Sequence, residues 1–415
     1  MLMNFNLPDI PASCSEYSTY EWLRQCGQLS RQMSRASSSA LLGSSSKAFR
    51  LAGGVFDTYG RARFTHTDPG FNITEITRKR RSLGIAEKVV CPDTFGDLIH
   101  FSKDGGGNEP RVLIVPPMSG HFPSLVRGTV LALLNNNDVY VVNWKNPRDI
   151  SIYKGDFGIS EYIQYIMTFI RKVGRGVHVI AVCQPCPLVL SAVALMSEAG
   201  ETELPGSMTL IAGPVDTRVS PTAPCEFAQR HSLNWFKDNL SYVPLPFGGM
   251  GRLVLPGFRQ VGGFMAMNLE THTRKHQEQF ENLVSGEGGL SEKHASFYRD
   301  FRAVSDLPSK FFLETIDAIF LRHLLPKGEL RWYDQAVNLG AVTKVPTLVI
   351  EGANDDITGR GQTKAALDLL TGLDLSKVAL HIASGVGHYG TFTGSRFNQS
   401  IAPCIEKFIR SHDHG

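Results

Sequence analysis

Three reactive side chains occur along the chain in the order thiol, carboxylate and imidazole. Cys183 follows an apolar run at residues 177–182 that is rich in β-branched residues, and a second apolar stretch begins at Leu188. Asp355 and His388 each lie in a glycine-containing loop after a later apolar run. These are the groups that nucleophilic catalysis requires, as nucleophile, orienting acid and general base. Their types and order therefore predict an acyl-transfer site.

The expected chemistry is that of an activated thiol. A cysteine at the start of a helix and beside an imidazole ionises more readily than a free thiol. His388 would take the proton of Cys183 and then give it to the leaving alkoxide. Asp355 would hold the tautomer of His388 and stabilise its imidazolium form. Asp356 is a competing acid, because either aspartate of this pair could serve as an ordinary turn residue.

An oxyanion formed at Cys183 needs two hydrogen-bond donors. One should be the backbone N–H of Gln184, directly after the nucleophile. The other should come from the loop Pro116-Pro117-Met118-Ser119-Gly120-His121. Since Pro117 has no N–H, Met118 and Ser119 are the candidates. His121 and Tyr389 are candidates for lining the substrate site, although His121 could equally be a loop residue that shapes this turn.

The elements around these residues alternate between strand and helix patterns. We expect strands at residues 89–91, 98–101, 112–115, 139–144, 177–182, 207–212, 347–351 and 377–381, and helices at 125–134, 159–173, 188–196 and 401–411. Such alternation predicts a mostly parallel sheet with helices on both faces, and the strand, nucleophile and helix around Cys183 predict the nucleophile elbow of an α/β-hydrolase. The usual elbow is G-x-S-x-G, whereas this chain has Ala181-Val182-Cys183-Gln184-Pro185.

Four segments are expected: a helical N-terminal extension at 1–85, a first part of the core at 86–216, a cap or lid insertion at 217–338, and a second part of the core at 339–415. In the extension, Trp22, Cys26, Leu29 and Met33 fall at helical spacing, and a second helical pattern includes Val55, Phe56 and Tyr59. The insertion is rich in aromatic residues. Most should form its own core, and a minority should line a groove for an apolar substrate.

Composition excludes several classes of protein. The chain has 415 residues, of which 42% are hydrophobic and 20% charged, and its net charge of +3 is too small to suggest nucleic-acid binding. No apolar run approaches the roughly 20 residues that a membrane span needs. The seven cysteines are sparse and odd in number. With no export signal at the N-terminus, they indicate reduced thiols in a cytoplasm rather than a disulfide framework.

Two other chemistries use the same residues. Cys183-Gln184-Pro185-Cys186 is a C-x-x-C motif between a strand and a helix, which is a redox signature. A dithiol protein would, however, leave Asp355 and His388 without a role. A metal site is a weaker prediction, because no second pair of cysteine or histidine residues has ligand spacing. We therefore expect no metal and no tightly bound cofactor.

The chain resembles the intracellular poly(3-hydroxybutyrate) depolymerases from about Phe56 onward. The stretches that carry the resemblance are Val182–Pro185, Leu255–Phe258, Gly263–Asn268, His323–Pro326, Glu351–Gly359 and Gly385–Gly390. The resemblance implies that Cys183 is the nucleophile, that His388 is the base, and that Asp355 rather than Asp356 is the acid.

The resemblance also implies a substrate and a location. These depolymerases degrade amorphous polyester granules in the bacterial cytoplasm and release 3-hydroxybutyrate monomers or oligomers. Water or the thiol of coenzyme A could accept the acyl group. Polyhydroxyalkanoate synthases use a cysteine in a related fold, so a synthase-like acyltransferase is the near alternative. The resemblance gives no oligomeric state.

Overall fold

A computed structural model describes residues 14–61, 63–78, 80–105, 107–267, 269–286, 295 and 297–413 of the chain. Asn268, part of one stretch that carries the resemblance, and residues 1–13 of the predicted N-terminal extension lie outside these described residues.

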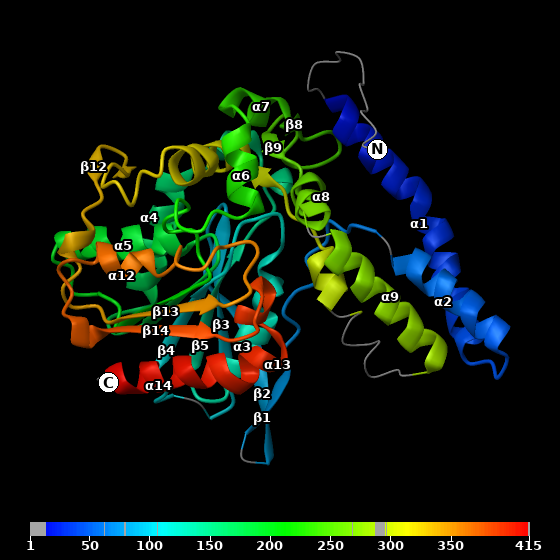
Figure 1. Cartoon of the computed structure of the whole chain (residues 1–415), viewed down its shortest axis with the longest axis horizontal. Coiled ribbons are helices and arrows are strands. Elements are labelled where there is room, and N and C mark those ends of the chain that lie inside the picture. Colours follow the sequence, from blue (N-terminus) through cyan, green and yellow to red (C-terminus); the bar gives the residue numbers. More distant parts are fainter. Residues whose placement is uncertain are drawn as a thin grey trace.

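A nine-stranded sheet forms the centre of the described structure (Figure 1). Its order is β1-β2-β3-β5-β4-β6-β7-β13-β14. The strands are β1 (Glu75–Arg78), β2 (Arg81–Cys91), β3 (Gly96–Lys103), β4 (Arg111–Val115), β5 (Asp138–Trp144), β6 (His178–Val182), β7 (Ser207–Ile211), β13 (Thr347–Gly352) and β14 (Val378–Ala383). The six strands from β5 to β14 are parallel, while β1, β2 and β3 pair antiparallel. This strand order is that of the α/β-hydrolase fold, so the predicted fold is confirmed.

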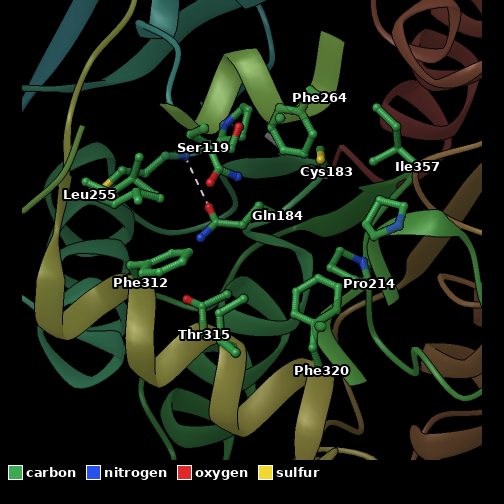
Figure 2. A pocket seen from close by; sticks show the side chains of 18 of the residues that line it. Ser119, Cys183, Gln184, Pro214, Leu255, Phe264, Phe312, Thr315, Phe320 and Ile357 are labelled. Carbon is green, nitrogen blue, oxygen red and sulfur yellow. Dashed lines mark hydrogen bonds between the residues drawn. The ribbon is translucent and has the colours of Figure 1, made fainter. Parts of the chain in front are cut away.

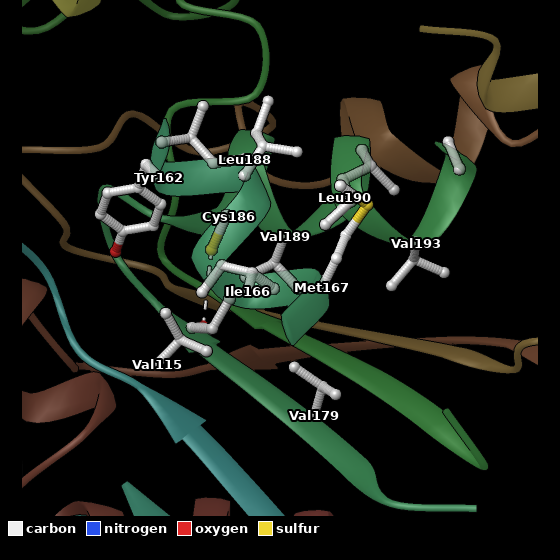
Figure 3. Packing of buried hydrophobic residues seen from close by; sticks show 14 of the residues in the cluster. Val115, Tyr162, Ile166, Met167, Val179, Cys186, Leu188, Val189, Leu190 and Val193 are labelled. Carbon is white, nitrogen blue, oxygen red and sulfur yellow. Dashed lines mark hydrogen bonds between the residues drawn. The ribbon is translucent and has the colours of Figure 1, made fainter. Parts of the chain in front are cut away.

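Helices cover both faces of the sheet because the buried strands are apolar on both sides. Leu113 and Val179 face one layer, which contains α4 (Ile159–Val173) and α5 (Cys186–Glu198). Figure 3 shows this layer around Cys186. Ile114 and Ile180 face the other layer, which contains α3 (Arg127–Leu134) and α14 (Ala402–His412). Alternate residues of one strand thus supply two separate cores.

The segment between β7 and β13 lies over the carboxyl ends of the parallel strands. It contains α6 (Ala223–Arg230), α7 (Leu233–Asp238), α8 (Gly257–Met267), α9 (Leu269–Ser285) and α11 (Ser309–Thr315), which continues as a π-helix at Ile316–Leu321. It also contains a small sheet of β8 (Ser241–Tyr242), β9 (Leu253–Leu255) and β10 (Leu307–Pro308), and a hairpin of β11 (Arg331–Trp332) and β12 (Gln335–Ala336). The sequence did not predict these strands, because two or three residues are too few to show an alternating pattern.

Two N-terminal helices lie along one flank, away from the sheet: α1 (Cys14–Leu42) and α2 (Lys47–Arg61) (Figure 1). The prediction that residues 1–85 are helical is wrong from Glu75 onward, where β1 and the start of β2 form a hairpin. Ile76 and Ile85 of this hairpin are buried in the sheet's second core, which explains why the segment is extended. The division of the chain at 85, 216 and 338 stays a prediction.

Near the C-terminus, α12 (Ala365–Leu369) follows β13, and a short 3₁₀ turn at His388–Thr391 follows β14. The short helix α13 (Gly394–Arg396) is continued by a π-helix at Phe397–Ile401 that leads into α14. The loops after β4, β6, β13 and β14 all lie at one edge of the sheet, because these strands are parallel.

Candidate active site

Cys183 lies at the sharp turn between β6 and α5. Its φ angle is +67°, in the left-handed region that costs a non-glycine residue about 1–2 kcal/mol. Two backbone bonds hold this conformation. The N–H of Cys183 donates to the carbonyl of Ile211 at 2.7 Å, and its carbonyl accepts from the N–H of Cys186 at 3.1 Å. A strained turn of this kind places the reactive atom above the sheet edge, as in a nucleophile elbow.

Gly213, just after β7, supplies space that the elbow needs. A Cβ atom at this position would lie 2.2 Å from the Cβ of Cys186 and 2.7 Å from the carbonyl oxygen of Cys183. The two glycines of the usual elbow are replaced here by Ala181 and Pro185. The glycine that lets the elbow pack closely therefore lies just after the neighbouring strand β7, and not in the elbow itself.

His388 joins the other two predicted residues. Its Nε2 atom is 3.2 Å from the Sγ atom of Cys183. Its Nδ1 atom is 2.9 Å from Oδ2 and 3.1 Å from Oδ1 of Asp355. The Asp355 carboxylate is fixed in turn by the N–H groups of Ile357 and Thr358, at 2.9 and 2.8 Å. The structure thus brings together the thiol, imidazole and carboxylate chosen from the sequence.

The charges at this site favour the imidazolium form of His388. Burial by itself would lower the pKa of His388, but the Asp355 carboxylate and the Cys183 sulfur raise it well above its usual value. The side chains of His388 and Asp355 are only 4% and 1% exposed, so water screens their attraction weakly. An imidazolium next to a sulfur atom is the arrangement that stabilises a thiolate.

The predicted oxyanion donors lie beside Cys183, but one of them already has a partner. The N–H of Met118 donates to the side-chain Oε1 atom of Gln184 at 3.1 Å (Figure 2). The backbone N–H of Gln184 is the other predicted donor, so the Gln184 side chain folds back toward its own oxyanion site. The loop itself is anchored at Pro116, whose carbonyl accepts bonds from Trp144 at 3.0 Å and Tyr162 at 3.3 Å.

An apolar cavity of about 340 Å³ opens at Cys183. Its walls include Ser119, Gln184 and His388 from the hydrolase core. Most of the remaining lining comes from the segment between β7 and β13, including Phe227, Trp235, Phe236, Leu255, Phe264, Met267, Phe311, Phe312 and Phe320. Figure 2 shows Phe264 and Cys183 among these lining residues, together with Phe312 of α11 and Phe320 of the π-helix. A minority of the aromatic residues of this segment therefore borders the site, as expected.

His121 and Tyr389 both border this cavity. Burial lowers the pKa of His121 to about 4, so its ring is neutral at pH 7. The ring packs beside Phe301 with 4.9 Å between the ring centres. His121 therefore presents a neutral, largely apolar wall and does not supply a positive charge to the site.

Glu351 is a supporting residue to which the sequence analysis gave no role. Its carboxylate is buried at the end of β13 and accepts N–H bonds of 2.9–3.0 Å from Gly361, Thr363 and Lys364. These bonds fold the loop that carries Asp355. The hydroxyl of Thr363 also bonds Gly213, which connects this loop to the elbow. A glutamate at the end of an apolar strand was the available signal, because a buried carboxylate must find donors.

Cys186 does not resemble the second thiol of a redox pair. It is fully buried below the elbow, and burial raises its pKa well above the usual value. Its Sγ atom contacts the carbonyl oxygens of Ala181 at 3.5 Å and Ile211 at 3.6 Å. Both Cys183 and Cys186 are free thiols. A buried thiol with a raised pKa is a poor partner for thiol–disulfide exchange.

The described residues contain no group of three or more histidine, cysteine or acidic side chains arranged to hold a metal ion. Among the helices of the described segments, none combines the length and apolar character that crossing a membrane requires.

Residues 212–413 match the family described as PHB de-polymerase C-terminus, where PHB is poly(3-hydroxybutyrate). The matched segment contains Asp355 and His388 and begins after Cys183. Since it covers slightly less than half of the chain, it relates this segment to that family. Together with the fold, the match supports an ester hydrolase. No curated protein matches the chain significantly.

The solved structures that resemble this chain share little sequence identity with it. A bacterial membrane phospholipase A is 14% identical, with 80% of this chain and 87% of that chain covered and a TM-score of 0.43. The 2-hydroxy-6-oxo-6-phenylhexa-2,4-dienoate hydrolase of Rhodococcus sp. strain RHA1 is 13% identical, with 79% and 99% covered and a TM-score of 0.45. A hydrolase from Pseudomonas aeruginosa PA01 is 12% identical, with 78% and 98% covered and a TM-score of 0.45. The fold assignment rests on the strand order instead.

Proposed function

We propose that this protein cleaves the ester bonds of poly(3-hydroxybutyrate) or a related polyhydroxyalkanoate through an acyl-thioester on Cys183. The observation that carries the proposal is the position of His388, which bridges the Cys183 thiol and the Asp355 carboxylate beside an apolar cavity. The family match over residues 212–413 supports a polyester as substrate. The products would be 3-hydroxybutyrate monomers or oligomers.

The first half of the reaction forms the acyl-enzyme. With the thiol proton held by His388, the Cys183 sulfur attacks the carbonyl carbon of the ester. The resulting oxyanion is stabilised by the N–H of Gln184 and by that of Met118, once the Gln184 side chain has moved away. The tetrahedral intermediate then collapses, the carbon–oxygen bond to the leaving chain breaks, and His388 gives its proton to the departing alkoxide.

The second half releases the acyl group. A water molecule loses a proton to His388 and attacks the thioester carbonyl, after which the Cys183 sulfur leaves and recovers the proton. The products are a carboxylic acid and the free enzyme. Coenzyme A is an alternative acceptor whose thiol would give a thioester product by the same steps. Neither acceptor requires a resident cofactor or metal ion.

The walls of the cavity fit this class of substrate. A hydroxyalkanoate chain has an ester group in each unit, separated by methylene groups and short alkyl branches, and carries charge only at its ends. Aromatic and aliphatic side chains exclude water from such a chain, and the apolar surface that they bury drives binding. The ester carbonyl is then the polar group that remains to be satisfied near Cys183.

A granule-clearing experiment tests the proposal. Amorphous polyester granules are incubated with the protein, and the loss of turbidity is followed. We expect clearing by the wild type and none by Cys183→Ala. Mass spectrometry of the wild-type protein, quenched during turnover, should show a hydroxyacyl group on Cys183. Substantial clearing by Cys183→Ala would contradict the assignment of the nucleophile.

Cys186→Ala is the matched control, since it removes the second thiol of the C-x-x-C motif. A dithiol redox protein requires both cysteines equally, whereas the hydrolase requires only Cys183. We therefore expect Cys186→Ala to clear granules, with a stability loss of about 1 kcal/mol from the small cavity. Equal loss of activity in both variants would favour the redox alternative.

The proposal also places the protein at the surface of storage granules in the cytoplasm. The free thiols of Cys183 and Cys186 fit a reducing compartment. Fractionation of cells that contain polymer should recover the protein with the granules. Recovery of the protein in a periplasmic fraction, from cells that contain no polymer, would contradict this location.

A further inference from the structure

The helix α2 has small residues on its buried side and large apolar residues on its exposed side. Its buried positions are Gly53, Gly54, Asp57 and Gly60. Its exposed side chains include Phe49, Val55, Phe56 and Tyr59, which are between 42% and 56% exposed. A helix of a globular protein normally buries its large apolar side chains against the core. In α2 this arrangement is inverted, because the large apolar side chains are exposed and the glycines are buried.

The inversion follows from how closely α2 packs against its neighbours. A Cβ atom at Gly53 would lie 2.8 Å from the backbone of Leu42, and one at Gly60 would lie 2.3 Å from Arg35, both in α1. A Cβ atom at Gly54 would lie 2.8 Å from Phe280 in α9. Glycines thus form the contacts on both sides of α2. Packing through small residues is typical of helices whose large side chains face an apolar surrounding.

The helix α1 adds a second exposed stripe. Trp22, Leu29 and Met33 are 64%, 66% and 64% exposed, and Cys26 between them is exposed as well. These residues follow helical spacing and lie on one side of α1. Together, residues 22–42 of α1 and all of α2 form a helical pair that we call the arm. Its exposed aromatic and aliphatic side chains exceed what scattered surface residues explain.

The arm carries a net positive charge. It contains Arg24, Arg31, Arg35, Lys47, Arg50 and Arg61, and one acid, the buried Asp57, which pairs with Arg61 at 2.6 Å. Arg24 also pairs with Glu21, directly before the arm, at 2.7 Å. A helix that displays apolar side chains together with cationic ones is suited to lie on an apolar surface that carries negative groups. A polyester particle presents methyl and methylene groups together with the carboxylate ends of its chains.

The arm is also connected to the cavity. The ring of Tyr20, at the base of α1, stacks on Phe258 of α8 with 3.7 Å between the ring centres. The same helix α8 lines the cavity with Phe264 and Met267, and Met267 is itself 38% exposed. Figure 1 shows α1, α2, α8 and α9 grouped on one flank of the molecule. The arm therefore adjoins one wall of the candidate active site.

We propose that the arm is the surface by which this protein lies on the polyester particle. This inference rests on the proposed function, because the occupant is the polymer that the active site would cleave. The exposed stripes of α1 and α2 would enter the apolar surface, and the cations would contact the carboxylate chain ends. The contact would hold α8 and the adjoining cavity next to the polymer chains.

Substitution of three residues of the arm tests the proposal. The variant Trp22→Ser, Leu29→Ser, Met33→Ser is compared with the wild type by co-sedimentation with amorphous poly(3-hydroxybutyrate) granules. Because each buried apolar side chain contributes about a tenfold factor in affinity or more, we expect granule affinity and the rate of clearing to fall at least tenfold. Hydrolysis of a soluble 3-hydroxybutyrate dimer should stay within about twofold of the wild type.

A matched control replaces three exposed apolar side chains outside the arm. Ile152, Tyr153 and Leu375 are 45%, 93% and 85% exposed, and their replacement by serine should leave granule affinity unchanged. Equal losses in both triple variants, or unchanged affinity in the arm variant, would overturn the proposal. If the wild type does not hydrolyse the soluble ester, the proposed function is contradicted instead. Co-sedimentation with granules would still test the arm in that case.

An environment-sensitive probe on Cys26 gives a measurement that does not require the triple variant to fold. In a Cys183→Ala background, granules should shift the emission of this probe toward that of an apolar solvent. Vesicles of phosphatidylcholine and phosphatidylglycerol should give a smaller shift at equal surface area. A larger shift with vesicles would identify a lipid surface as the occupant, and a shift on raising the protein concentration alone would identify a second copy of the chain.

Discussion

The elbow at Cys183 and the N-terminal arm use glycine in opposite ways. At the elbow, Gly213 makes room for a strained turn that is surrounded by buried apolar side chains. In the arm, Gly53 and Gly60 let two helices touch, and the large side chains are left outside. The first arrangement fixes one atom in space, while the second displays a surface. Changes at the elbow should therefore affect every substrate, whereas changes in the arm should affect only particulate ones.

Asp355→Asn should have the largest effect. Burial opposes the charge on His388, and the Asp355 carboxylate is the main group that restores it. Without this carboxylate, the pKa of His388 falls and its ring loses the acceptor that fixes its tautomer. We expect kcat to fall by roughly 10³–10⁴ on soluble esters and on granules alike. Steady-state kinetics on both substrates measure this change.

Retention of granule binding by Asp355→Asn provides the control, because the substitution lies outside the arm. Co-sedimentation should match that of the wild type. A loss confined to granules, with soluble-ester hydrolysis intact, would contradict the role of Asp355 and the contrast between the two regions.

Asp306 tests the junction between the arm and the core. Its buried carboxylate accepts hydrogen bonds from Tyr17 of α1 at 2.6 Å and from the N–H of Gly257 in α8 at 2.9 Å, near Glu21 and Arg148. Burial raises its pKa from 3.8 to about 6. The folded protein therefore holds a proton that the unfolded chain releases, and this contribution to stability is present below pH 3.8 and lost as the pH rises through 6.

Relative to Asp306→Asn, the free energy of unfolding of the wild type should fall by about 2 kcal/mol between pH 4 and pH 7. Urea denaturation of both proteins across this range measures the difference. A difference that does not change with pH would show that Asp306 keeps one protonation state throughout.

Gly213→Ala should disturb the elbow alone. The added methyl group meets Cys186 and the carbonyl of Cys183, and overpacking of this kind costs about 2 kcal/mol. We expect a lower free energy of unfolding together with a lower kcat, since the turn that carries the thiol must shift. Gly262→Ala in α8 is the matched control, because no atom lies within 4 Å of a Cβ there. A Gly213→Ala protein with wild-type kcat would show that the turn can relax without moving the sulfur.

Gln184→Ala should have the smallest effect, and in the opposite direction. It removes the side-chain oxygen that occupies the N–H of Met118, a bond worth about 1 kcal/mol. The substrate carbonyl no longer has to displace it, so we expect kcat/KM for a small soluble ester to rise about fivefold. A fall in kcat/KM would show instead that the Gln184 side chain is needed to hold the Met118 loop.

The sequence predicted the parts of the molecule that follow from strand and helix periods. Helix α4 begins and ends at the predicted residues, Ile159 and Val173, and the strands expected at 89–91 and 98–101 lie in β2 and β3. Cys183, Asp355 and His388 could be chosen because residues at the carboxyl ends of parallel strands must converge.

Other features could not be derived from periodicity. The stripe of Trp22, Leu29 and Met33 identifies a helix, but a stripe has the same spacing whether a partner covers it or not. The bond between Met118 and the Gln184 side chain joins residues 66 positions apart and depends on one rotamer. Gly359 and Gly257 belong to stretches that carry the resemblance, and close packing explains why glycine stands at each position. An added Cβ would lie 1.9 Å from the carbonyl of Ser220 at Gly359, and 2.4 Å from the carbonyl of Ser305 at Gly257.

The helix α8 adjoins both regions, since Phe258 stacks on Tyr20, just before the arm in α1, and Phe264 borders the cavity. If binding of the arm to a surface displaces this helix, the free energies of surface binding and of cavity occupancy are coupled. Linkage then requires reciprocity: a ligand in the cavity changes the affinity for the surface by the same factor by which the surface changes the affinity for the ligand. The residence time of the enzyme on a particle would accordingly depend on whether a polymer chain occupies the cavity.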